Sequence, residues 1–159
     1  MDLRLIYALI LSILPISELR GGLPLAIIYA NENNIPITFV FPLIVLVNIF
    51  AIFLAFYFFD NIHHLFLKSK FYKKIFDLYV LKIQKKIDKF EKQYSSLGFL
   101  ALAIFVAIPL PGTGAWTGAI ISWILDLDRK KSILAICLGV LVAGILILFG
   151  TLGFLSIFS

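Results

Sequence analysis

Long apolar stretches alternate along the chain with short breaks that carry proline, glycine or charge. Leu3 to Leu14 is apolar and is interrupted by residues 15–24, after which Leu25 to Ala30 is apolar again. A polar loop, 31–36, precedes 21 almost wholly apolar residues, Phe39 to Phe59. Because a helix rises about 1.5 Å per residue, only the last stretch is long enough to cross a hydrocarbon core of about 30 Å.

The second half of the chain repeats this order. Leu97 to Ile108 is apolar, the break "PLPGTG" occupies 109–114, and Ala115 to Leu125 is apolar. The polar loop "DLDRKK" at 126–131 then precedes a long apolar run that begins at Ser132. Few residues are identical between the halves, so the repeat is one of architecture and hydropathy. We therefore expect repeat one over 1–59 and repeat two over 97–159 of a single membrane domain.

A basic segment, 60–96, connects the two repeats. Its first 35 residues hold nine lysines against four acidic residues. Apolar side chains recur there every three or four residues, which predicts an amphipathic helix; they are Phe76, Val80, Ile83, Ile87, Phe90 and Tyr94. Such a helix is either a solvated connector with one docking face or a segment that lies on the membrane surface.

The distribution of positive charge predicts how the chain crosses the membrane. If each broken segment crossed, the basic residues 60–94 and 126–131 would lie on opposite sides. If each is a re-entrant hairpin, both lie in the cytoplasm, as the positive-inside rule favours, and both termini are extracytoplasmic. The predicted fold is therefore an all-α integral membrane protein of the cell membrane. Two inverted repeats, each a re-entrant helical hairpin plus a transmembrane helix, are joined by a basic amphipathic cytoplasmic helix.

Composition supports a membrane protein and excludes several other classes. The chain is 62% hydrophobic, against about 45–50% for soluble domains. Cys137 is the single cysteine and lies far in sequence from His63 and His64, so we expect neither a disulfide nor a metal site, and no cofactor. No hydrolase motif is present, so we expect no enzyme activity. The net charge of +5 indicates contact with lipid rather than with nucleic acid, because apolar runs flank the basic segment.

The charged residues Glu18 and Arg20 lie in the first break, where hydrocarbon would reject them. Ionisable residues at membrane depth usually face the protein interior or a water-filled cavity, and they are functional candidates. Irregular backbone at that depth is also tolerated only there, so the two breaks should meet inside the protein. The expected binding residues are Ser17, Glu18, Arg20, Gly21, Gly22, Pro109, Pro111, Gly112, Thr113, Gly114, Trp116 and Thr117.

The same residues indicate the sign of the ligand. Helix N-termini and the guanidinium of Arg20 suit a phosphate or carboxylate group. Glu18 has the opposite sign, and its simplest role is that of a proton carrier. The alternative is that Glu18 and Arg20 form a structural pair that only holds the hairpin tip together.

Two motifs, "PISELRGGLPLAI" and "IPLPGTGAWTGAIISW", resemble the small multidrug export protein family, and the resemblance covers essentially the whole chain. That family looks like a distant relative of the DedA/VTT membrane proteins. The resemblance implies two re-entrant hairpins in inverted repeat and a transport function, either of lipid carriers such as polyprenyl phosphates or of small toxic compounds. It also implies that Glu18 and Arg20 are the charged residues of the first tip. The second tip departs from the DedA pattern because it carries no arginine, and a homodimer could supply further groups.

Three functions remain open from the sequence. The first is a transporter of an isoprenoid phosphate or related anionic lipid, in which Arg20 holds the phosphate and Glu18 exchanges a proton. The second is a proton-coupled exporter of small cationic compounds that bind at Glu18. The third is a membrane scaffold without transport activity, in which the hairpins only pack.

Overall fold

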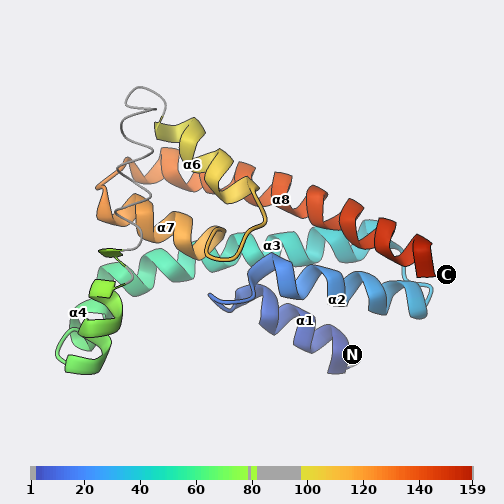
Figure 1. Cartoon of the computed structure of the whole chain (residues 1–159), viewed down its shortest axis with the longest axis horizontal. Helices are drawn as coiled ribbons and strands as arrows, with labels where there is room; N and C mark the ends of the chain where they lie inside the picture. The colour runs from blue at the N-terminus through green and yellow to red at the C-terminus, as the bar shows by residue number, and fades with distance from the viewer. Residues whose placement is uncertain (1–2, 79, 82–97, 159) are drawn as a thin grey trace.

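The computed structural model describes residues 3–78, 80–81 and 98–158, and every regular element in that part of the chain is a helix (Figure 1). Two helical segments are long and apolar enough to span a membrane, Ile37–Ile62 and Arg129–Ile157. Their 26 and 29 residues correspond to roughly 39 and 44 Å. A helical fold with two candidate spanning helices is therefore confirmed for the described residues.

The spanning segments correspond to three elements. The first combines α3 (Ile37–Tyr57) with the π-helix η1 (Phe58–Ile62), and the short α4 (His63–Phe66) follows it. The second lies within α8 (Arg129–Phe158).

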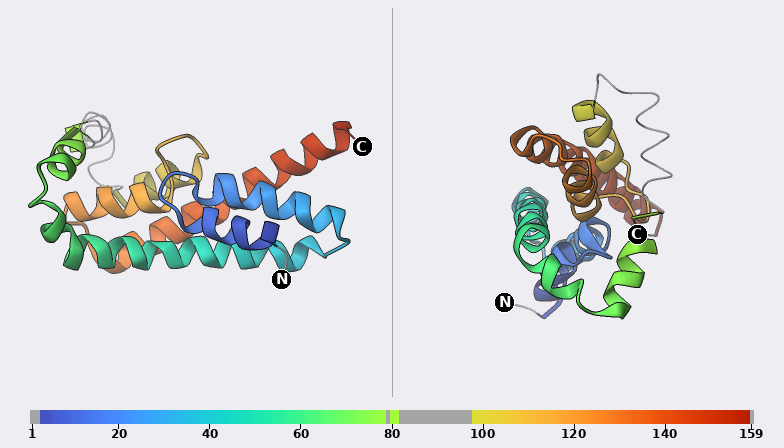
Figure 2. Two further views of the ribbon diagram at one scale, coloured as in Figure 1. Left: turned by 90° about the horizontal axis from the view of Figure 1, so that it is seen from below. Right: turned by 90° about the vertical axis from the view of Figure 1, so that its left-hand side faces the viewer.

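Four shorter helices form two pairs. A turn at residues 14–17 joins α1 (Leu3–Ile13) to α2 (Glu18–Glu32), and a turn at 108–114 joins α6 (Gly98–Ala107) to α7 (Ala115–Ile124). In Figures 1 and 2 each pair folds back on itself. The α1–α2 pair lies along one half of the long helices and the α6–α7 pair along the other, so the two turns meet midway.

Packing between the pairs and the long helices follows the same scheme in both halves. Helix α2 contacts α3 and α8, and α7 likewise contacts both; α1 also contacts α3, and α6 contacts α8. The centre is filled by fully buried aliphatic side chains, among them Leu23, Ile27, Ile44, Ile52 and Ile136. Helices α2 and α7 are therefore each in contact with both long helices.

Ion pairs identify which loops share an end of the bundle. Arg129, at the start of α8, forms a 2.9 Å ion pair with Asp60 of η1. Arg4 of α1 pairs with Glu32 at the end of α2, at 2.5 Å. The loop 126–131 therefore lies beside the start of the basic segment, whereas the loop 31–36 lies with the N-terminus at the other end (Figure 1).

The first break is shorter than predicted. The sequence predicts an interruption over 15–24, but α2 begins at Glu18 and includes Gly21, Gly22 and Pro24. The glycines are used for close packing instead: a Cβ on Gly22 would collide with Ser12 and the Ala8 carbonyl of α1. Only residues 14–17 lie between α1 and α2, so the prediction of a break through Pro24 was wrong.

The predicted amphipathic helix is described only in part. Residues 70–78 are helical and include Phe76, and Val80 is helical as well. The remaining apolar positions of the predicted stripe, Ile83, Ile87, Phe90 and Tyr94, lie outside the described residues.

Close contact between α6 and α8 leads to a stability prediction. A Cβ on Gly139 would lie 2.7 Å from the Ala103 carbonyl oxygen and 2.6 Å from the Val106 Cβ. Backbone cannot move aside cheaply, so Gly139→Ala should destabilise the protein by about 1–3 kcal/mol. Gly150→Ala on the same helix is the control, because a Cβ there meets nothing within 4 Å. Thermal unfolding in detergent should show a lower midpoint for Gly139→Ala alone, and equal midpoints would contradict this packing.

Candidate functional site

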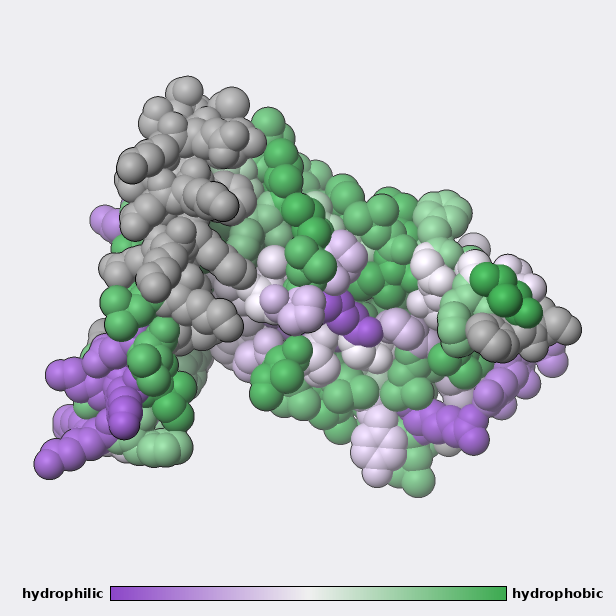
Figure 3. All heavy atoms as spheres, viewed as in Figure 1, coloured by the Kyte–Doolittle hydropathy of each residue, from purple (hydrophilic) through white to green (hydrophobic). Residues whose placement is uncertain are grey.

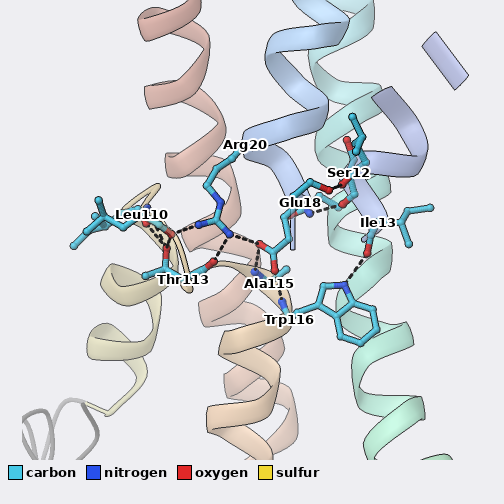
Figure 4. A network of polar contacts seen from close by, with 12 residues as sticks. Ser12, Ile13, Glu18, Arg20, Leu110, Thr113, Ala115 and Trp116 are labelled. Carbon is cyan, nitrogen blue, oxygen red and sulfur yellow. Dashed lines mark hydrogen bonds and ion pairs between the residues drawn. The ribbon is translucent and has the colours of Figure 1, made fainter. Parts of the chain in front are cut away.

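Glu18 is the first residue of α2, and its side chain enters the other half of the molecule. Only 2% of the residue is exposed. Its Oε2 accepts the backbone N–H of Ala115 at 3.1 Å, and its Oε1 accepts that of Trp116 at 3.0 Å (Figure 4). The first N–H groups of a helix have no partner within it and form the positive end of its dipole. Glu18 therefore caps α7 with a carboxylate that lies 97 residues away in sequence.

The backbone around this cap is unusual on both sides. Glu18 has φ of 48°, in the left-handed region that residues with side chains rarely adopt. Gly114, the residue before α7, has φ of 120°. A Cβ on Gly114 would overlap the Glu18 carboxylate. Position 114 therefore requires glycine for two reasons: a side chain would strain the backbone at this φ, and it would leave no room for the Glu18 carboxylate.

Arg20 holds the backbone of the second turn from the opposite side. Its Nη1 donates to the Leu110 carbonyl, and its Nη2 donates to the Thr113 carbonyl at 2.9 Å. The same Nη2 lies 3.9 Å from Glu18 Oε2. Since the guanidinium is a planar fork, its two terminal nitrogens donate to separate carbonyls in one fixed orientation.

Three further hydrogen bonds join the two halves or brace one of the turns. Trp116 Nε1 donates to the Ile13 carbonyl at 2.7 Å, which satisfies the C-terminal end of α1. The Thr113 hydroxyl lies 2.6 Å from the Ile108 carbonyl and braces the second turn internally. Ser17 Oγ donates to the Leu11 carbonyl at 2.6 Å. The Trp116 bond therefore joins the two halves (Figure 4), and the other two bonds each brace one turn internally.

A small cavity lies beside this network. Its volume is about 20 Å³, and Glu18, Arg20, Asn48 and Thr113 contribute its polar lining. That is room for about one water molecule. In this conformation the pocket is thus too small to hold an organic ligand.

The structure brings together some of the predicted site residues. Glu18, Arg20, Pro109, Thr113 and Gly114 line the cavity, and Trp116 binds Glu18 through its backbone.

Other predicted residues lie away from the cavity. Gly21 packs against Ser17, and Gly22 packs against α1. Pro111 and Gly112 are exposed on the outer part of the second turn, and Thr117 is buried within α7.

Asn48 is a cavity residue that the sequence analysis did not include. It is 1% exposed, and its Nδ2 donates to the Ser12 carbonyl at 2.7 Å. In the sequence it stands out as a strongly polar residue in the otherwise apolar run that forms α3. Within the described part of the chain, no three His, Cys, Asp or Glu residues are grouped as metal ligands would be.

A family model described as "Putative small multi-drug export protein" matches residues 18–146. The chain belongs to the small multi-drug export protein family. A search of curated proteins found no match, and a search of solved structures found none either. The match begins at Glu18 and includes Arg20, the whole second turn and α7. Glu18, Arg20 and their partners in the second turn and α7 therefore lie inside the matched region, whereas α1 and Ser17 precede it.

Gly114 allows the cap to be tested without changing a charged residue. Gly114→Ala should destabilise the protein by about 3 kcal/mol, because it adds backbone strain and displaces the Glu18 carboxylate from α7. Gly112→Ala is the control: Gly112 has φ of 82° but open space around it, so it should cost only about 1–2 kcal/mol of strain. Both are measured by thermal unfolding in detergent. A loss at Gly112 as large as that at Gly114 would show that the collision with Glu18 is unimportant.

Proposed function

We propose that this chain is a proton-coupled transporter of an anionic amphiphile, such as an isoprenoid phosphate or a related phospholipid-type molecule. The observation that carries the proposal is the position of the Glu18 carboxylate. It occupies two backbone N–H groups at the N-terminus of α7, beside the guanidinium of Arg20. A helix N-terminus beside an arginine is an anion-binding site, and here the protein fills it with its own anion.

Charge balance links substrate binding to a proton. With Glu18 ionised, the network carries one negative and one positive side chain. If Glu18 takes up a proton, it no longer suits the N–H groups of Ala115 and Trp116, and Arg20 is left without a counterion. A substrate anion then fits the place of the carboxylate. One proton therefore accompanies one negative charge into the site.

Exposed apolar side chains on both turns favour a substrate with a hydrocarbon tail. Leu14 and Ile16 of the first turn are 45% and 93% exposed, and Ile108 and Leu110 of the second are 45% and 56% exposed. Figure 3 shows a small hydrophilic patch midway along the molecule, bordered by hydrophobic surface. A tail could lie on this apolar surface while its charged head reaches Arg20.

The proposed mechanism places both turns at the middle of the bilayer. The helices that flank them have 10 to 15 residues and reach about 15–22 Å, which is too short to span. Each pair would then be a re-entrant hairpin, and the two halves an inverted repeat, an arrangement that transporters use around a midplane site. By the positive-inside rule the end with Arg129 and the basic segment is cytoplasmic, and both termini are extracytoplasmic.

Export of small cationic compounds is the second candidate, because the description of the family names multi-drug export without stating the charge of the compounds. In that mechanism a cation and a proton would compete for Glu18. The surroundings of Glu18 oppose a cation, since two N–H groups and Arg20 already face the carboxylate. The two candidates therefore predict opposite effects for loss of Arg20. Binding of an anion should be prevented, whereas binding of a cation should become more favourable.

Thermal stabilisation of the purified protein by ligands distinguishes these functions. We expect farnesyl phosphate to raise the unfolding midpoint, because a ligand that binds only the folded state stabilises it. Farnesol, the uncharged control, and tetraphenylphosphonium, a lipophilic cation, should have little effect. Stabilisation by the cation alone would support the second candidate. No stabilisation by any of the three would favour a scaffold without transport activity.

A further inference from the structure

Outside the site, a short helix of residues 70–78 follows α4 and the turn 67–69. In Figures 1 and 2 it projects from the end of the bundle where α3 ends, across the direction of that helix. One face holds it to the bundle. The Tyr72 hydroxyl lies 2.9 Å from Nδ1 of buried His63, and the Phe76 ring centroid lies 4.3 Å from that of His63. His63 in turn contacts Trp123 of α7, so the helix has a fixed position.

A second face of this helix is apolar and has no cover in the described structure. Phe71, Ile75 and Leu78 are 75%, 50% and 59% exposed. Their spacing of four and three residues places them on one side of the helix. Large apolar groups in water cost free energy in proportion to their exposed area, so this stripe requires an apolar medium.

The third face of the helix is basic. Lys70, Lys73 and Lys74 are exposed, and Lys68 in the preceding turn adds a fourth positive charge, against Asp77 alone. Figure 3 shows this projecting end with hydrophilic residues on its outer side and hydrophobic residues on the side towards the bundle. The apolar stripe and the lysines therefore lie on two different sides of the helix, and neither is the side that contacts His63.

We propose that residues 70–78 bind an anionic lipid surface. Phe71, Ile75 and Leu78 enter the edge of the hydrocarbon layer, and the lysines bind anionic headgroups at the same leaflet. A basic amphipathic helix suits this position because its buried area and its charge both favour the interface. The position at the end of α3 supplies the lipid, since headgroups surround a spanning helix where it leaves the hydrocarbon. This inference does not depend on what the transport site binds.

Spin labels on single cysteines in the full-length protein test whether residues 70–78 bind the lipid surface. The native cysteine is first removed by Cys137→Ala. The labels are placed by Phe71→Cys and Ile75→Cys on the apolar face and by Lys73→Cys on the basic face as the matched control. The protein is reconstituted in phosphatidylcholine vesicles with and without one part in four of phosphatidylglycerol. Collision with oxygen, which concentrates in hydrocarbon, is compared with collision with a water-soluble nickel chelate.

Labels at 71 and 75 should collide several-fold more with oxygen than with the chelate, and the label at 73 should show the reverse. Phosphatidylglycerol should increase this contrast, and the combined change of Lys70, Lys73 and Lys74 to Gln should remove the increase. Equal access of the chelate to all three labels would overturn the proposal, because the stripe would then lie in water. The proposal would also be overturned if the labels at 71 and 75 were immobile and neither reagent reached them, both in detergent and in vesicles. A second protein copy would then cover the stripe.

Discussion

Glu18→Ala should destabilise the protein by about 3–5 kcal/mol, the range found when one partner of a buried charge pair is removed. The change leaves the N–H groups of Ala115 and Trp116 without an acceptor and removes the only counterion within 4 Å of Arg20 in the described structure. Each buried N–H that loses its acceptor costs about 1–3 kcal/mol. Chemical or thermal unfolding in detergent measures the loss.

Glu32→Ala is the matched control for this prediction. Glu32 also pairs with an arginine, Arg4, but about half of each side chain in that pair is exposed. Exposed pairs contribute about 0–1 kcal/mol, so the control should unfold almost as the unchanged protein does. If the two variants lost the same stability, Glu18 would not be a buried cap.

Arg20→Lys should weaken ligand binding while it leaves the positive charge in place. The guanidinium binds the carbonyls of Leu110 and Thr113 through different nitrogens, and the flexible ammonium of lysine lacks this fixed, planar arrangement of donors. We expect a loss of about 2 kcal/mol in binding of farnesyl phosphate, which is about 30-fold in affinity. The measurement is the concentration of farnesyl phosphate that gives half of the thermal stabilisation.

The exposed arginine Arg4 provides the control for Arg20. Arg4→Lys keeps the charge at a position far from the two turns and should leave the affinity unchanged. Unchanged affinity in Arg20→Lys would show that only the charge matters, and that the fork does not orient the second turn.

The run lengths in the sequence were sufficient to predict the helices that span. The apolar runs 39–59 and from 132 onwards became α3 and α8, because length and hydropathy are local properties. The inference that Glu18 and Arg20 belong together at a turn was also possible from sequence. Two charged side chains in an apolar run require polar partners or a water-filled cavity in any fold.

The partners of those charges could not be predicted from local sequence. Glu18 caps a helix in the other half of the chain, and Arg20 binds carbonyls about 90 residues away. Such contacts depend on how the two pairs of helices pack. The extent of the first break was misjudged for a related reason: Gly21 and Gly22 resemble loop residues in sequence, but Gly22 allows α1 and α2 to approach closely and Gly21 leaves room for Ser17.

The position of Glu18 also changes the interpretation of the helix N-terminus. From the sequence, the first N–H groups of α7 were expected to face a ligand. In the structure the carboxylate of Glu18 occupies them, so a ligand must replace it. Release of Glu18 from α7 is then the step that would couple the proton to the substrate.

Proton uptake on ligand binding tests this account most directly. The purified protein in weakly buffered detergent is mixed with the monomethyl ester of farnesyl phosphate, which carries one fixed negative charge near neutral pH and exchanges no proton itself. We predict uptake of close to one proton for each ligand bound, and none in Glu18→Gln. Binding without proton uptake in the unchanged protein, or equal uptake in Glu18→Gln, would contradict the claim that the substrate anion takes the place of the Glu18 carboxylate.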